Sequence, residues 1–96
     1  SQPKPLYHWV GYQEQVYAHF KNDGSGPEQQ IAALEASLQE ARAQDAVPPP
    51  GFHAHLGMLY AEVGKADQVR QQFETEKTLF PESAPYMDFL LRNAER

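Results

Sequence analysis

The sequence predicts an all-α fold built from antiparallel helical hairpins, and three observations carry that prediction. Apolar residues recur at helical spacing over 52–63 and again over 66–73. Gly64 separates the two runs, and a glycine readily adopts the left-handed conformation that ends a helix. Pro81 closes the second run because it has no backbone N–H to donate. We therefore expect two helices that pack side by side, approaching most closely at Gly57.

The residues in these runs also have a recognisable spacing. It is His53-x2-Leu56-Gly57-x2-Tyr60, then Val69-x3-Phe73, then Pro81. This resembles the signature of tetratricopeptide repeats, with His53 in place of Trp and Val69 in place of Ala. The first helix should bury a face formed by Phe52, Leu56, Leu59, Tyr60 and Val63. The second helix should bury a facing stripe formed by Ala66, Val69 and Phe73.

A degenerate copy of the same unit is predicted over residues 7–45, after an extended segment over 1–6. The spacing Trp9-x2-Tyr12-x3-Val16 matches that of the clear repeat, which predicts a helix from about Val10 to Lys21. A turn at 22–26 leads to Pro27, a residue that suits the first position of a helix. That helix should reach about Gln44, with a narrow stripe made of Ile31, Leu34, Leu38 and Ala41.

The segment from Asp45 to Pro50, with three consecutive prolines, forms a stiff connection to the clear repeat over 51–81. A closing helix is predicted over 83–96, with Ser83 as its N-cap. Its apolar stripe is Met87, Leu90, Leu91 and Ala94. The prediction is thus a single domain of about five helices, in which the last helix shields the end of the array.

Composition limits the classes of partner and chemistry. The 96 residues carry 8 basic and 13 acidic side chains, for a net charge of −5, which disfavours nucleic acid and anionic membrane surfaces. The chain has no cysteine, so it offers neither a disulfide nor a thiolate metal site. No apolar run approaches the roughly 18 residues that a membrane span needs. The 41% hydrophobic content is typical of a folded domain.

No catalytic, metal or cofactor site is expected. His53 and His55 lie two residues apart, so they point to different sides of a helix and cannot hold one ion together. Gly24-Ser25-Gly26 lacks the Gly-Lys-Ser/Thr of a phosphate-binding loop. Glu74 and Glu76 also face different directions, and we expect both on a solvated surface. An enzyme therefore has no positive support in the sequence.

Three segments resemble a group of small uncharacterised lipoproteins of Gram-negative bacteria. They are Leu6-Tyr7-x-Trp9-x-Gly11-Tyr12, the run from Pro49 to Gly57, and the run from Phe73 to Ser83. In that family a lipid-bearing cysteine precedes the Tyr-x-Trp segment, and the genes commonly neighbour one for a curli-secretion-channel-like lipoprotein. The resemblance implies a periplasmic protein held at the outer membrane by a lipid anchor that lies outside this chain. It also implies an envelope partner, with the curli-secretion-channel-like lipoprotein as the candidate.

The tetratricopeptide resemblance implies where such a partner would bind. In these repeats the first helix of each hairpin lines a groove for a peptide or an extended segment. The positions that match are Val10, Glu14, Tyr17 and Ala18 in the degenerate unit and Ala54, Met58, Ala61 and Glu62 in the clear unit. An equal alternative is that two units curve too little to form a groove, or that the last helix fills it.

Two function hypotheses follow. The first is a helical-repeat adaptor that binds an envelope protein and supports assembly of a secretion or surface complex. The second is a self-associating structural module of the envelope, in which Tyr86 and Phe89 of the last helix contact another copy. Tyr7 and Trp9 are interpreted as a plug over the first hairpin, with a partner anchor as the alternative.

Overall fold

The fold comes from a computed structural model that describes residues 25–94. Every regular element in that range is helical, so the predicted all-α class is confirmed there. Four α-helices and one short 3₁₀ helix are present among these residues. The expected helix from about Val10 to Lys21 and the extended segment over 1–6 lie outside the described residues.

The chain divides into two compact units, Ser1–Pro49 and Pro50–Arg96. The division falls within the proline run that separates the two predicted repeats. In the first unit, the described part contains α2, Pro27–Ala43, which begins at the proline predicted to open it. Leu34, Leu38 and Ala41 are buried, as the stripe predicts.

Helix α2 ends in a left-handed residue that is not glycine. Asp45 has φ 54°, and its N–H donates to the Arg42 carbonyl at 3.1 Å. The Ala46 N–H donates to the Ala41 carbonyl at 2.8 Å. This pair of bonds is a Schellman cap, in which an aspartate occupies the position that glycine usually takes.

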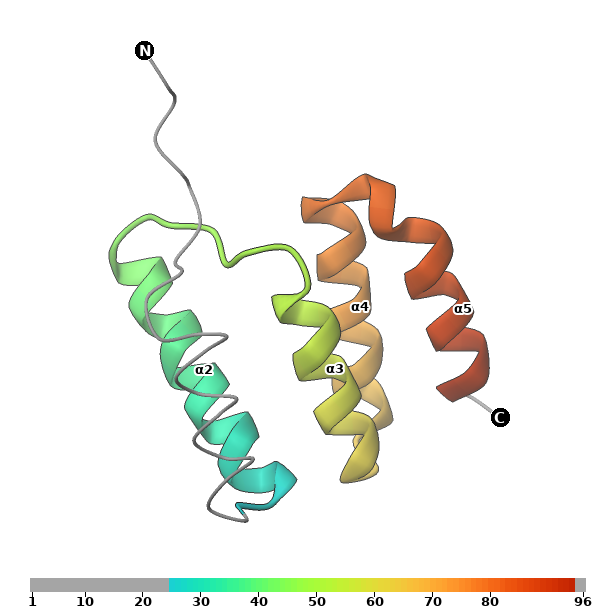
Figure 1. Cartoon of the computed structure of the whole chain (residues 1–96), viewed down its shortest axis with the longest axis horizontal. Helices are drawn as coiled ribbons and strands as arrows, with labels where there is room; N and C mark the ends of the chain where they lie inside the picture. Colours follow the sequence, from blue (N-terminus) through green and yellow to red (C-terminus); the bar gives the residue numbers. More distant parts are fainter. Residues whose placement is uncertain (1–24, 95–96) are drawn as a thin grey trace. The chain divides into compact units, whose positions relative to one another are not determined.

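The second unit contains α3 (Phe52–Glu62), α4 (Ala66–Leu79), the 3₁₀ helix η2 (Pro81–Ser83) and α5 (Ala84–Ala94). Helices α3 and α4 run antiparallel beside each other, and α5 turns back along α4 after η2 (Figure 1). The two-helix hairpin predicted from the periodicity is therefore present, with both helices close to their expected bounds.

Gly64 ends α3 as predicted. Its φ is +76°, and its N–H donates to the Ala61 carbonyl at 3.1 Å while the Lys65 N–H donates to the Tyr60 carbonyl at 3.0 Å. These are the two bonds of a Schellman cap, here with glycine at the left-handed position. The next helix starts at Ala66, so the chain reverses within three residues.

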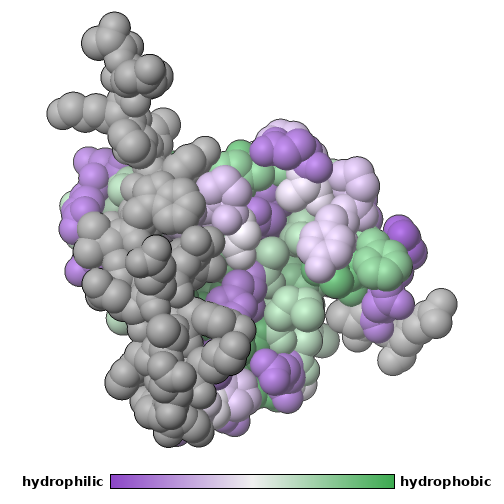
Figure 2. Space-filling view, viewed as in Figure 1, coloured by the Kyte–Doolittle hydropathy of each residue, from purple (hydrophilic) through white to green (hydrophobic). Residues whose placement is uncertain are grey.

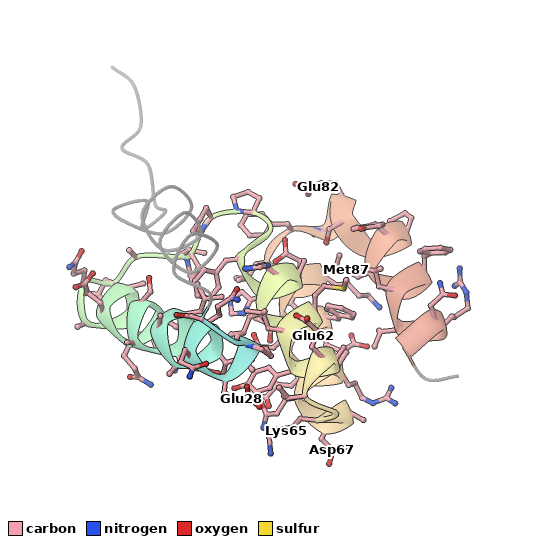
Figure 3. The ribbon with its side chains drawn as sticks, turned by 60° about the horizontal axis from the view of Figure 1, so that its bottom comes forward. Glu28, Glu62, Lys65, Asp67, Glu82 and Met87 are labelled. Carbon is pink, nitrogen blue, oxygen red and sulfur yellow. The ribbon has the colours of Figure 1, made fainter. Side chains whose placement is uncertain are left out.

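The core of the second unit joins all three of its α-helices. Val69 and Phe73 from α4 pack with Met87 and Leu91 from α5. Partly buried side chains of α3 and α5 pack against this cluster, namely Ala54, Tyr60 and Leu90. Figure 3 shows Met87 reaching from α5 toward the α3–α4 pair. Most of the predicted stripe residues are buried or half-buried, whereas Ala66 is exposed at the start of α4. The side chain of Ala94 lies outside the described part of the chain, so its place in the stripe stays a prediction.

The junction between α4 and α5 differs from the prediction in one detail. Ser83 was expected to cap α5 by accepting a backbone N–H. Its hydroxyl instead donates to the Phe80 carbonyl at 2.7 Å and to the Glu76 carbonyl at 3.4 Å. Both carbonyls also accept backbone N–H groups at 2.8 Å, Glu76 from Phe80 and Phe80 from Ser83, so the hydroxyl adds a further contact at the C-terminal end of α4.

Candidate interaction surfaces

The α3–α4 hairpin is held at close range by Gly57. A Cβ atom at this position would lie 2.7 Å from Phe73 Cδ1, closer still to Phe73 Cε1, and 3.3 Å from Gln72 Cβ. Phe73 is itself only 1% exposed, so its ring has no room to withdraw. The absence of a side chain at residue 57 is what lets the two helices meet, as the sequence predicts.

A buried carboxylate joins the same two helices at the N-terminal end of α3. Glu76 of α4 is 2% exposed. Its Oε2 accepts the Gly51 N–H at 2.9 Å, and its Oε1 accepts the Ala54 N–H at 3.3 Å. These donors belong to the N-cap and the first turn of α3, where backbone N–H groups have no intrahelical acceptor. The negative charge also faces the positive end of the α3 dipole.

Glu76 corrects the expectation of a solvated glutamate. Glu74 is exposed as predicted, but Glu76 is buried and caps a helix distant in sequence. The sequence did contain a signal for this. Glu76 lies in phase with Val69 and Phe73, at intervals of four and three residues, so it falls on the apolar stripe of α4. A carboxylate on a buried stripe needs hydrogen-bond partners.

His53 forms the third contact between the two helices. Its Nδ1 lies 2.7 Å from Gln72 Oε1, and both residues are buried. Because an amide oxygen only accepts, Nδ1 carries the proton and donates. The His53 ring also meets the Phe52 ring edge-on, with centroids 5.3 Å apart. His53 is therefore a packing residue with a satisfied donor, as its position in the repeat signature predicts.

His55 is half-buried on α3, two residues along. Burial lowers the pKa of its imidazole below the ordinary value of 6.5, and the nearby Glu62 carboxylate partly opposes that shift. Within residues 25–94, no three histidine, cysteine, aspartate or glutamate side chains are grouped closely enough to hold a metal ion. In the same range, no helix is long and apolar enough to cross a membrane.

The predicted partner-binding residues of α3 form a single stripe. Met58 and Glu62 are one helical turn apart, and both are exposed, Met58 to 46%. Ala61 is exposed between them. Ala54, at the start of the stripe, is half-buried and packs against the α4–α5 core cluster. The solvent-facing part of the stripe therefore extends from Met58 to Glu62. Figure 3 labels Glu62, the last residue of α3.

The predicted partner-binding residues Val10, Glu14 and Tyr17 lie outside the described residues, as do Ala18, Tyr7 and Trp9. They remain predictions from the sequence.

The second candidate surface lies on α5. Tyr86 and Phe89 are 59% and 51% exposed, although Met87, which lies between them in the sequence, is buried. Figure 2 shows hydrophobic atoms at the surface over α5, bordered by hydrophilic ones. The opposite face of α5 carries Met87 and Leu91 into the core. Helix α5 thus has an apolar stripe on both sides, as its sequence predicts.

An ion pair links α5 to α4 at the rim of the core. Lys77 Nζ lies 2.7 Å from Asp88 Oδ1 and 3.6 Å from Glu74 Oε1. The hydrogen bond to Asp88 raises the pKa of the Lys77 amine, and the charge of Glu74 adds to the effect. The pair is solvent-accessible, so it orients α5 more than it stabilises it.

Comparison with known proteins identifies a family but no activity. Residues 6–90 match a family model described as a domain of unknown function (DUF4810). The chain belongs to this family. Searches of curated proteins and of solved structures found no match to it. The matched range includes the α3 stripe and the aromatic residues of α5, so both candidate surfaces lie within the family domain.

Proposed function

We propose that this chain is a non-enzymatic adaptor with tetratricopeptide-like hairpins. It binds an envelope protein through the exposed stripe on the first helix of each hairpin. In the described residues that stripe runs from Met58 to Glu62 on α3. The observation that supports the proposal most is the exposure of Met58 on a hairpin whose polar interior is fully bonded. No buried side-chain nitrogen or oxygen of the described residues lacks a partner.

The contacts inside the hairpin also favour binding over catalysis. Both oxygens of Glu76 accept backbone N–H groups of α3, and His53 Nδ1 donates to Gln72. A general acid or base needs a proton-transfer atom within reach of a substrate. The buried groups of this hairpin are committed to packing, and the exposed groups are those of a contact surface.

The stripe suits a partner segment with apolar and basic residues. Met58 supplies flexible apolar contact, and methionine adapts its shape to different partners. Glu62 at one end disfavours acidic segments and favours lysine or arginine. The proposed setting is the periplasm, with attachment to the outer membrane through a lipid on the full-length protein, and the proposed partner is a curli-secretion-channel-like lipoprotein. The family resemblance described above supports this setting.

A binding experiment tests the adaptor. The immobilised chain is incubated with detergent extracts of Gram-negative envelopes, and retained proteins are identified by mass spectrometry. We expect one envelope lipoprotein to be retained, and Met58→Arg to reduce its recovery at least about tenfold, the effect of losing about 1.4 kcal/mol. Gln71→Arg, an exposed position on α4, is the matched control. Equal recovery with both variants would contradict the stripe.

A second candidate function is a self-associating structural module. The exposure of Tyr86 and Phe89 favours it, because terminal units of repeat arrays usually present a polar outer face. Sedimentation analysis of the chain over a wide concentration range tests this function. A monomer at every concentration would remove it.

The tetratricopeptide-like arrangement itself needs a test in the first unit. An experimental structure should show residues 7–45 as a second antiparallel hairpin, with Tyr17 on the same side of its first helix as Glu14. A single continuous helix over these residues would contradict the repeat.

A further inference from the structure

The outer face of α5 combines two aromatic rings with a cation. Tyr86 and Phe89 are each more than half exposed. Arg92 and Asn93 follow them on the same side of the helix, at intervals of three and four residues from Phe89, and both are exposed. Arg92 has no ion-pair partner among the described residues, whereas Lys77 on the neighbouring helix has two. The stripe Tyr86–Phe89–Arg92 is therefore exposed to solvent.

This stripe also lacks negative charge, in a chain whose net charge is −5. Helix α5 has one carboxylate, Asp88, and its Oδ1 is bound to Lys77 Nζ at 2.7 Å on the side that faces α4. Two copies of an acidic protein repel each other over most of their surfaces. Contact between copies is therefore less opposed by charge where the α5 stripe of one copy meets that of another.

We propose that the α5 stripe binds the α5 stripe of a second copy, with the two helices antiparallel about a two-fold axis at Phe89. This inference rests on the second proposed function, the self-associating module. Tyr86 lies three residues before Phe89 and Arg92 lies three residues after it. An antiparallel pairing centred on Phe89 thus places each Tyr86 ring opposite Arg92 of the other copy.

The stripe fits itself better than it fits an unrelated helix. An isologous contact requires one surface that contains both members of each complementary pair. Here the guanidinium of Arg92 meets the negative face of the Tyr86 ring, twice, and the two Phe89 rings meet at the axis. A parallel pairing would instead place Arg92 against Arg92.

The contact is small, so the association is weak. A single pair of three-turn helices buries less than the roughly 1,200 Å² of a standard interface. The expected behaviour is a monomer in dilute solution and a dimer at high concentration. A high local concentration, such as that on a membrane surface, would favour the dimer.

Charge substitutions test the register. Sedimentation analysis is carried out on the whole 96-residue chain at increasing concentration. Tyr86→Arg places like charges opposite each other and should raise the dimer dissociation constant at least about tenfold. Adding Arg92→Glu to Tyr86→Arg restores opposite charges and should recover the wild-type dissociation constant or a lower one. Gln71→Arg on α4 is the matched control, and it should leave the association unchanged.

Crosslinking tests the two-fold axis by comparing positions rather than by measuring affinity. Because the chain has no cysteine, each single-cysteine variant reports one position. Phe89→Cys should form a disulfide-linked dimer under mild oxidation. Tyr86→Cys should form it far more slowly, because two residues at position 86 are separated by about 9 Å along the antiparallel axis. Circular dichroism of each variant checks that the helices remain folded.

The outcomes separate this inference from the function on which it rests. A wild-type chain that stays monomeric at every concentration overturns both. Association that persists with Tyr86→Arg, or Tyr86→Cys crosslinking as fast as Phe89→Cys, overturns the α5 pairing and leaves self-association by another surface. Loss of association with Tyr86→Arg that the double variant fails to restore overturns the antiparallel register.

Discussion

The α3–α4 pair and the α4–α5 pair are joined by different kinds of contact. Between α3 and α4, Gly57 allows close approach, and two buried polar contacts fix the register, one from Glu76 and one from His53. Between α4 and α5, the contact is an apolar cluster with an exposed ion pair at its rim. Buried hydrogen bonds are directional, whereas apolar packing tolerates small shifts. We therefore expect a rigid hairpin that carries a more easily detached α5.

The largest effect is expected at Glu76. Replacing it with alanine removes both acceptors of the α3 N-terminus and leaves a cavity in a site that is 2% exposed. Bonds to a charged acceptor contribute about 1.5–3 kcal/mol each, so the unfolding free energy should fall by about 3 kcal/mol. Urea denaturation followed by circular dichroism measures the change. Glu76→Gln keeps one acceptor oxygen and should lose about half as much. Equal stability of Glu76→Ala and wild type would show that the cap is dispensable.

The second-largest effect on stability is expected at Gly57. Gly57→Ala brings a Cβ into the Phe73 ring, at an expected cost of about 1–3 kcal/mol, although alanine alone favours a helix by about 1 kcal/mol. Phe73→Leu shortens the opposing side chain, so the alanine should cost less in that background. A double-mutant cycle by denaturation measures the difference. Strict additivity of the two changes would mean that the clash is absent.

A pH dependence should arise from His55. Its pKa is lowered in the folded state, so the unfolded chain binds the proton more readily. The contribution of His55 to the unfolding free energy is then complete above its ordinary pKa of 6.5. It is lost as the pH falls through the lower folded-state pKa, by at most about 1.4 kcal/mol per pH unit. His55→Gln should flatten the curve of unfolding free energy against pH between pH 7.5 and 5. If the two proteins lose stability in parallel, other groups cause the dependence.

The smallest effect is expected at the α4–α5 ion pair. Lys77 has a raised pKa, so the contribution of the pair is complete below 10.5 and is lost as the pH rises through the folded-state value. Because the pair is solvent-accessible, Asp88→Asn should change the denaturation midpoint little, and less at high salt. A loss as large as that of Glu76→Ala would contradict the comparison.

The sequence was sufficient for the hairpin and insufficient for its polar contacts. Periodicity and the breakers Gly64 and Pro81 predicted α3 and α4, because these signals are local. The Glu76 cap joins residues more than twenty positions apart, and helical spacing alone does not reveal which N–H groups a carboxylate will meet. Ser83 was misassigned for a similar reason, since its hydroxyl had carbonyls of α4 within reach.

For the candidate surfaces too, the sequence predicts the local features and misses those that depend on distant parts of the chain. Exposure of Met58, Tyr86 and Phe89 agrees with helical phase, whereas the half-buried state of Ala54 depends on where α5 packs. Asp45 was predicted only as part of a connection, and its left-handed backbone is only weakly signalled, because aspartate adopts that conformation less readily than glycine.

Native-state hydrogen exchange tests the central comparison most directly. Amides of α5, such as those of Leu90 and Leu91, should exchange with a lower opening free energy than amides in the middle of α3 and α4. The Ala54 amide, bound to Glu76, should exchange together with α4 and become faster in Glu76→Ala. If α5 exchanges only through the same opening as the hairpin, or is better protected than α3, the proposed difference between the two helix pairs is wrong.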